Sequence, residues 1–154
     1  MISDILKGVL IGSSSRSGLN NDYIAMKTGT TNIDSATVSK YNLKSSVRDY
    51  WLDGYTHDTV ISVWIGFDEI SIDNKHYMKN EDAETRNRIF NEVAKVSFSH
   101  DNKDFIQPSG VVRSRIEHPS MEDGTIYLAS SKTPSNLVSD ELFKVGTEPL
   151  NISL

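Results

Sequence analysis

The residues of this chain that are best suited to chemistry lie between positions 23 and 32, where a short apolar run ends in small hydroxyl residues. Lys27 and Gly29 occupy alternate positions, and Thr28 and Thr30 occupy the positions beside them. On a strand, alternate residues share a face, so one face carries an ammonium group beside bare backbone and the other carries two hydroxyls. Ammonium, hydroxyl and backbone N–H groups together suit a bound carboxylate or a developing oxyanion. This stretch is therefore the candidate anion-binding strand.

Two further strands are predicted to pair with this one, which itself covers about residues 22–30. Residues 48–56 and 59–67 read as strands, and residues 60–67 form a nearly continuous apolar run, which is typical of a central strand covered on both faces. We interpret Trp64 in this run as a core residue. Residues 57–58 predict the tight turn of an antiparallel hairpin. The pattern thus predicts at least three antiparallel strands.

A helix is predicted at each end of this sheet. Residues 2–10 carry apolar side chains at helical spacing, and Ser3 is a candidate N-cap. Residues 82–98 have acidic side chains at their start, where the helix dipole favours negative charge. The apolar stripe of this second helix is predicted to consist of Ile89, Phe90, Val93 and Val96. We expect both helices to pack on one face of the sheet.

Polar segments connect these elements. Residues 12–18 read as a flexible loop, which would position a serine nucleophile poorly. Residues 33–47 read as a long hairpin connection, which either rims a cleft or is a tolerated surface insertion. Residues 68–80 are acidic but lack the ligand spacing of a calcium loop, so we interpret them as a solvated connection.

The last third of the chain is predicted to form an extension with short strands. Residues 111–116 favour a strand, and residues 125–128 are its candidate hairpin partner. Residues 141–149 are expected to pack loosely. We therefore divide the chain into residues 1–98 and residues 99–154.

Composition restricts the function classes. The 154 residues include 37% hydrophobic and 24% charged side chains, as is typical of a folded globular chain. The net charge of −5 argues against a general nucleic-acid binder. The absence of cysteine excludes disulfides and thiolate metal sites, and the four histidines lack a metal-ligand spacing, so neither a metal nor a cofactor is expected. No apolar run approaches the ~20 residues that cross a membrane, and no signal peptide is visible.

Three motifs follow one another along the chain. Residues 27–32 read Lys-Thr-Gly-Thr-Thr-Asn, residues 49–56 read Asp-Tyr-Trp-Leu-Asp-Gly-Tyr-Thr, and residues 63–66 read Val-Trp-Ile-Gly. This series resembles the C-terminal half of the transpeptidase domain of penicillin-binding proteins, and the bifunctional class A type is the nearest match. The resemblance covers about residues 1–149, and the chain departs from the family at His57, where proline is usual.

The resemblance implies an α/β (α+β) fold, in which helices pack on an antiparallel sheet as in the C-terminal portion of the penicillin-binding, β-lactamase-like fold. Residues 1–98 would be the C-terminal part of the transpeptidase domain, and residues 99–154 would be a C-terminal extension. The resemblance also implies a location at the bacterial cell surface, on the outer face of the cytoplasmic membrane, with any anchor supplied by the parent protein.

The resemblance also assigns roles to the candidate strand. Its substrate-binding positions would be Lys27, Thr28, Gly29, Thr30 and Thr31, and its catalytic positions would be Lys27 and Thr30. Lys27 would hold the hydroxyl of a Ser-x-Asn element, and Thr28 and Thr30 would bind the terminal carboxylate of a peptidoglycan stem peptide or of a β-lactam. The backbone N–H of Thr30 would donate to the oxyanion, and the strand edge would pair with the extended peptide.

The attacking group of this family is absent from the sequence. No lysine has a serine three residues before it, and no asparagine has a serine two residues before it, so neither Ser-x-x-Lys nor Ser-x-Asn is present. Whether the chain alone is an enzyme therefore stays open. The chain is either the C-terminal piece of a D,D-transpeptidase that acts with an N-terminal remainder, or a non-catalytic peptidoglycan-peptide binding module, or a purely structural piece.

Overall fold

The computed structural model describes residues 1–8, 19, 23–118 and 124–152 of the chain. The chain divides into two compact units, Ile2–Phe105 and Ile106–Leu154. The predicted loop at residues 12–18 and the end of the first predicted helix lie outside the described residues. No helix among the described residues is long and apolar enough to cross a membrane.

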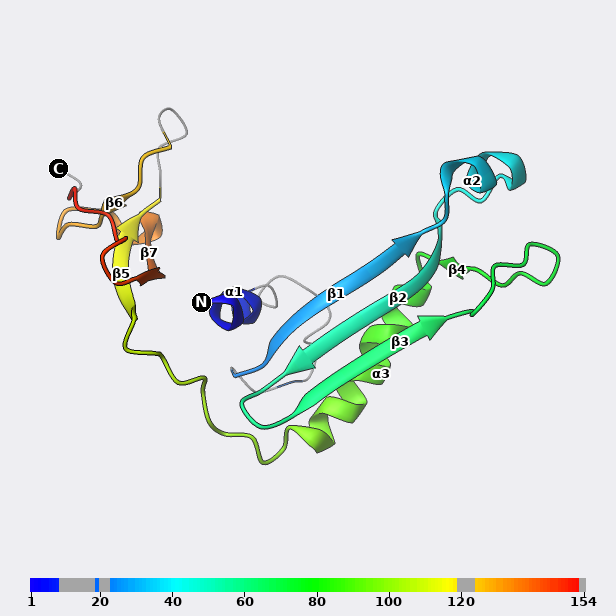
Figure 1. Cartoon of the computed structure of the whole chain (residues 1–154), viewed down its shortest axis with the longest axis horizontal. Helices are drawn as coiled ribbons and strands as arrows, with labels where there is room; N and C mark the ends of the chain where they lie inside the picture. The colour runs from blue at the N-terminus through cyan, green and yellow to red at the C-terminus, as the bar shows by residue number, and fades with distance from the viewer. Residues whose placement is uncertain (9–18, 20–22, 119–123, 153–154) are drawn as a thin grey trace. The chain divides into compact units, whose positions relative to one another are not determined.

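The first unit is built on an antiparallel sheet whose long strands lie side by side in chain order (Figure 1). The long strands are β1 (Ala25–Asn32), β2 (Ser46–Tyr55) and β3 (Val60–Gly66). A short strand, β4 (Met78–Lys79), pairs with the start of β2. The three predicted strands and the hairpin between β2 and β3 are therefore confirmed.

The last strand of this series, β3, is covered on one face only. Ile61 and Val63 are buried, whereas Val60 and Trp64 are 75% and 40% exposed. The prediction of a strand covered on both faces was wrong, and so was the placement of Trp64 in the core. The physical reason is that β3 pairs with β2 alone within the described sheet, and one helix packs against one of its faces.

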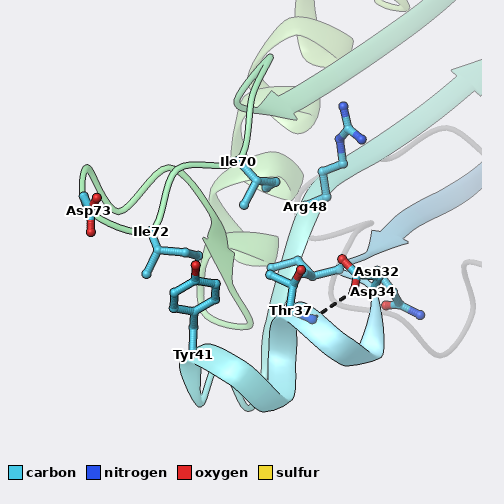
Figure 2. Close-up of a pocket in the computed structure, with 9 residues that line it drawn as sticks. Asn32, Asp34, Thr37, Tyr41, Arg48, Ile70, Ile72 and Asp73 are labelled. Carbon is cyan, nitrogen blue, oxygen red and sulfur yellow. Dashed lines mark hydrogen bonds between the residues drawn. The ribbon is translucent and has the colours of Figure 1, made fainter.

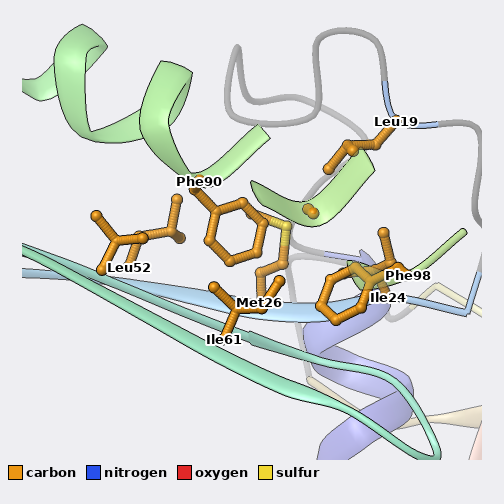
Figure 3. Close-up of a cluster of buried hydrophobic side chains, with 9 residues drawn as sticks. Leu19, Ile24, Met26, Leu52, Ile61, Phe90 and Phe98 are labelled. Carbon is orange, nitrogen blue, oxygen red and sulfur yellow. The ribbon is translucent and has the colours of Figure 1, made fainter. Parts of the chain in front are cut away.

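That helix is α3 (Asp82–Ser97), which buries Phe90 and Ala94 against the sheet (Figure 3). The core cluster consists of Leu19, Ile24, Met26, Leu52, Ile61, Val63, Phe90, Ala94 and Phe98. Complete burial of each large apolar side chain contributes about 1.5–3 kcal/mol. This cluster is therefore the main source of stability for the first unit.

The predicted apolar stripe of α3 was right at Phe90 and wrong elsewhere. Ile89, Val93 and Val96 are 40%, 43% and 75% exposed, and the buried positions of the helix are Arg86, Asn87, Phe90, Asn91 and Ala94. Arg86 and Asn87 are tolerated under the helix because they are hydrogen-bonded: Arg86 Nη1 donates to the Trp51 carbonyl at 3.3 Å, and Arg86 Nη2 donates to Asn87 Oδ1 at 2.7 Å.

The first helix, α1 (Ile2–Gly8), contacts β1. The hydroxyls of Ser3 and Tyr55 lie 3.0 Å apart, and Lys7 Nζ donates to Asp104 at 2.7 Å. In Figure 3, α1 lies on the opposite side of the strands from α3. The expectation that both helices pack on one face was therefore wrong, because α1 follows the side of the sheet to which Tyr55 points.

An additional helix, α2 (Ser35–Tyr41), lies in the segment that was predicted to be a polar connection. Asp34 caps its start, where the carboxylate accepts a hydrogen bond from Thr37 N at 2.9 Å. Asn42 ends it in the left-handed conformation, with φ of 51°. An aspartate before the helix and an asparagine after it are typical cap residues, and they were the signals missed in the sequence.

The second unit contains a three-stranded antiparallel sheet in the order β6-β5-β7. Its strands are β5 (Val111–Glu117), β6 (Tyr127–Leu128) and β7 (Val138–Lys144), and a short 3-10 helix, η2 (Ser135–Leu137), precedes β7. The predicted strand and its short partner are confirmed. The tail that was expected to pack loosely begins in β7, which pairs with β5 along its whole length but has no buried residue. Sheets with packed helices confirm the predicted α+β class.

Gly54→Ala is expected to destabilise the first unit by about 1–3 kcal/mol, because overpacking forces neighbours to move. A Cβ at this position would lie 2.3 Å from Phe90 Cζ and 3.2 Å from Met26 Cγ. Urea unfolding followed by circular dichroism measures the change. Gly8→Ala is the control, because open space surrounds its Cβ position. An unfolding midpoint for Gly54→Ala equal to that of the control would contradict the close contact with Phe90.

Candidate functional site

The five candidate residues, Lys27 to Thr31, lie in the middle and second half of β1. Within the described sheet β1 pairs only with β2, so its other edge carries no strand partner. Lys27 lies opposite Asp53, Thr28 opposite Leu52, Gly29 opposite Trp51, Thr30 opposite Tyr50 and Thr31 opposite Asp49. The alternation predicted for the candidate strand is therefore present at an edge where a ligand can pair with the backbone.

Lys27 has an exposed side chain that lies against the backbone of its own strand. Its ammonium donates a hydrogen bond to the carbonyl of Thr28 at 2.8 Å. The residue opposite it, Asp53, accepts a hydrogen bond from the hydroxyl of Ser62. The four-carbon stem of lysine is flexible, so rotation of the side chain can release the ammonium from this carbonyl.

Gly29 makes room for a side chain of the neighbouring strand. A Cβ built on Gly29 would lie 3.1 Å from the Cβ of Trp51, which is its cross-strand partner. On this face, Trp51 therefore occupies the space that the missing side chain of Gly29 leaves beside β1. The sequence predicted a close approach at this position but did not identify the group that makes it.

Thr28 is half-buried, whereas Thr30 and Thr31 are exposed. Their hydroxyls and the neighbouring backbone amides are the groups of β1 that can bind an anion. None of the five candidate residues lines either of the two cavities described below. Within the described part of the chain, these five residues of the candidate anion-binding strand therefore form an exposed strand edge and do not line either cavity.

One cavity, of about 520 Å³, begins at the C-terminal end of β1 (Figure 2). Asn32, α2 and the connection from β3 to β4 form its walls. Hydrogen bonds from the side chain and then the backbone of Thr37 lower the pKa of Asp34 below its ordinary value, so this carboxylate in the wall is ionised at neutral pH. A second cavity, of about 320 Å³, lies between the residues after α2 and those around β4.

Two tryptophans lie on the face of the sheet away from α3. Trp51 and Trp64 are 41% and 40% exposed, they are cross-strand partners, and their ring centroids are 6.3 Å apart. Val60, on the same strand as Trp64, is 75% exposed. Sequence analysis missed this surface because it treated the apolar run as core. The signal was the alternation of these residues with the buried Leu52, Ile61 and Val63.

The backbone that carries Trp51 is held from the other side of the sheet. Arg86 is only 5% exposed, it donates to the Trp51 carbonyl, and its guanidinium lies 5.5 Å from the centroid of the Tyr50 ring. Burial lowers the pKa of Arg86 and raises that of Tyr50. Arg86 therefore supports β2 at the residue that packs on Gly29.

The described residues contain no metal-binding site, because no three His, Cys, Asp or Glu side chains among them lie close enough together to hold an ion. The chemistry that the described groups can perform is recognition of an anion and of an extended backbone. Both depend on hydrogen bonds along the free edge of β1.

Comparison with known proteins gives an informative match. No family profile matches the chain. Over 155 aligned positions, covering 99% of this chain and 16% of the relative, it is 33% identical to penicillin-binding protein 1A/1B of Bacillus subtilis (strain 168). The chain thus spans about a sixth of the length of that protein. Nearly the whole chain is therefore similar to a region of a penicillin-binding protein.

Proposed function

We propose that this chain is the C-terminal part of a serine D,D-transpeptidase of the bifunctional, class A type, which cross-links peptidoglycan stem peptides and binds penicillin. The observation that carries the proposal is the free edge of β1, which presents Lys27 to Thr31 in the order of the family motif. The similarity to a penicillin-binding protein over nearly the whole chain supports it.

In this proposal β1 binds the substrate rather than attacking it. An extended stem peptide adds to the free edge of the strand through main-chain hydrogen bonds. Thr28 and Thr30 bind its terminal carboxylate, the Thr30 N–H donates to the oxyanion, and the Lys27 ammonium supplies positive potential and holds the proton-shuttling serine. Loss of one such donor typically costs about 3–4 kcal/mol of transition-state stabilisation.

The attacking serine comes from an N-terminal remainder of the same domain. The tryptophan face of the sheet, formed by Trp51, Trp64 and Val60, is the surface that this remainder covers. Exposed aromatic residues that adjoin one another are typical of surfaces buried in an assembly. The complete enzyme acts at the bacterial cell surface, outside the cytoplasmic membrane.

A second candidate function is non-catalytic binding of peptidoglycan peptides. The observation that favours it is the absence of both Ser-x-x-Lys and Ser-x-Asn from the sequence. The two functions differ in whether a penicillin becomes covalently attached when the missing part of the domain is present.

The first test is covalent labelling with a fluorescent penicillin. The chain alone is expected to remain unlabelled, and an N-terminal remainder that carries Ser-x-x-Lys is expected to become labelled only when the chain is added. Lys27→Ala should slow this labelling by about 100-fold or more, because it removes the cation of the site. Lys44→Ala, at an exposed lysine outside β1, is the control. Labelling of the chain alone, or equal labelling rates for Lys27→Ala and the control, would overturn the proposal.

The second test concerns the tryptophan face. Trp51 and Trp64 are the two tryptophans of the chain, so intrinsic fluorescence reports on this face alone. Binding of the N-terminal remainder is expected to shift their emission to shorter wavelength as water is excluded.

Val60→Asp should weaken this association by about tenfold, because it buries a charge in the contact. Val96→Asp is the matched control, because this valine of α3 is also 75% exposed and belongs to a different element. Equal effects of the two substitutions would exclude the tryptophan face as the contact surface.

A further inference from the structure

Three polar residues form one row across the long strands of the first unit (Figure 1). Lys27 of β1 lies opposite Asp53 of β2, and Asp53 lies opposite Ser62 of β3. Directly opposed residues of an antiparallel sheet share a face and have Cβ atoms about 4.5–5.5 Å apart. All three residues are exposed, and the residues beside them in sequence that point to the other face are part of the core. The row therefore lies on the face of the sheet away from α3.

The middle residue of this row, Asp53, has a polar neighbour on either side. Toward β1 lies Lys27, whose four-carbon stem is long enough to bring its ammonium to an opposed residue. Toward β3 lies Ser62, whose hydroxyl donates a hydrogen bond to Asp53 Oδ1 at 2.5 Å. This length is within the range of hydrogen bonds from a hydroxyl to a carboxylate. The structure thus pairs Asp53 with Ser62.

The ammonium of Lys27 has a different partner. It donates to the Thr28 carbonyl at 2.8 Å, on its own strand. A carbonyl is a neutral acceptor, so this hydrogen bond does not neutralise the ammonium, whereas an ion pair with Asp53 would do so. Lys27 therefore keeps the positive charge that would attract an anion to β1.

The direction of the Asp53 hydrogen bond matters because the strand order sets the distances. Adjacent strands lie about 4.7–4.9 Å apart, and β2 lies between β1 and β3. A hydrogen bond to Ser62 turns the carboxylate toward β3, away from the ammonium and from any anion that binds at β1. Without this hydrogen bond, the attraction between opposed charges would draw the carboxylate toward Lys27.

We propose that Ser62 is a positioning residue for anion binding: its hydroxyl holds the Asp53 carboxylate on the β3 side of the row and so leaves the Lys27 ammonium for an anion on β1. Asp53, once released, would compete with that anion for Lys27. The anion considered is the terminal carboxylate of a peptide, so this inference rests on the proposed function.

The surroundings of the row determine how strong the effect is. Trp51 and Trp64 occupy the next row on one side, and Val60 lies on the other side, so the row crosses the tryptophan face. A partner that covers this face would exclude water from the row, and electrostatic interactions strengthen where water is excluded. A buried carboxylate also requires a hydrogen-bond donor, which Ser62 supplies. We therefore expect a larger effect in the assembled enzyme than in the chain alone.

The test measures the binding of N-acetyl-D-alanyl-D-alanine, a small peptide with a terminal carboxylate, to the 154-residue chain. Dissociation constants are obtained by NMR titration at low ionic strength, followed at the backbone amides of residues 27–31. Ser62→Ala is expected to weaken binding about two- to fourfold, because the released Asp53 carboxylate pairs with Lys27. The loss should shrink at high salt, which screens exposed charges.

Asp53→Asn separates this positioning role from a structural one. The variant carries no charge at this position, so it is expected to bind the peptide about twofold more tightly, and adding Ser62→Ala to it should cause no loss. Ser62→Thr retains the hydroxyl and should bind as the unchanged chain does. Ser99→Ala is the matched control, because it removes an exposed hydroxyl that donates to the Val96 carbonyl, outside the sheet. An equal loss from Ser62→Ala with and without Asp53→Asn would overturn the inference.

Lys27→Ala separates the inference from the proposed function. If it weakens peptide binding while Ser62→Ala has no effect, the positioning role is wrong and anion binding on β1 stands. If the chain does not bind the peptide, or if Lys27→Ala leaves the affinity unchanged, the positioning role is overturned as well. The proposed function is then judged independently by the penicillin labelling described above.

Discussion

The contact between Phe90 and Gly54 is the constraint on which the first unit depends. The ring of Phe90 occupies the space that a side chain at position 54 would fill, with Met26 on the neighbouring strand beside it. Only glycine at this position lets an aromatic ring approach the backbone of β2 so closely. Because Phe90 belongs to α3 and Met26 to β1, this contact fixes the helix against two strands and decides which face of the sheet is buried.

The position of the candidate site follows from this burial. Met26 is 1% exposed, and Lys27 is the next residue of the same strand, so burying Met26 turns Lys27 to the opposite face. A shift of one residue in the pairing of β1 would bury the lysine instead. The packing of Trp51 on Gly29 opposes such a shift. A residue with a side chain, placed opposite Trp51 instead of Gly29, would put its Cβ too close to the tryptophan. Packing on one face thus determines the chemistry offered on the other.

The sequence predicted the elements well where local signals agree, and poorly where tertiary contacts decide. Strand-like apolar runs and turn residues located β1, β2 and β3, and acidic residues marked the start of α3. The buried face of α3 was mispredicted because hydropathy excludes Arg86 from a core, whereas its hydrogen bond to the Trp51 carbonyl makes burial possible. The helix α2 was missed because its stability comes from caps rather than from an apolar stripe. For the candidate strand, the sequence predicted the alternation of its residues, but the occupant of the space beside Gly29 depends on cross-strand pairing.

The face of the sheet away from α3 exposes aromatic side chains. A strand with one covered face normally alternates apolar and polar residues, and β2 and β3 instead place two tryptophans on the side that α3 does not cover. Each exposed tryptophan leaves apolar area in water that a partner surface would remove, at about 25 cal/mol per Å². Trp51 also packs on Gly29, so a partner that covers this face lies next to the candidate anion-binding strand. In the proposed enzyme, docking of the N-terminal remainder therefore brings the attacking serine to β1 through the same side chains that hold the sheet surface together.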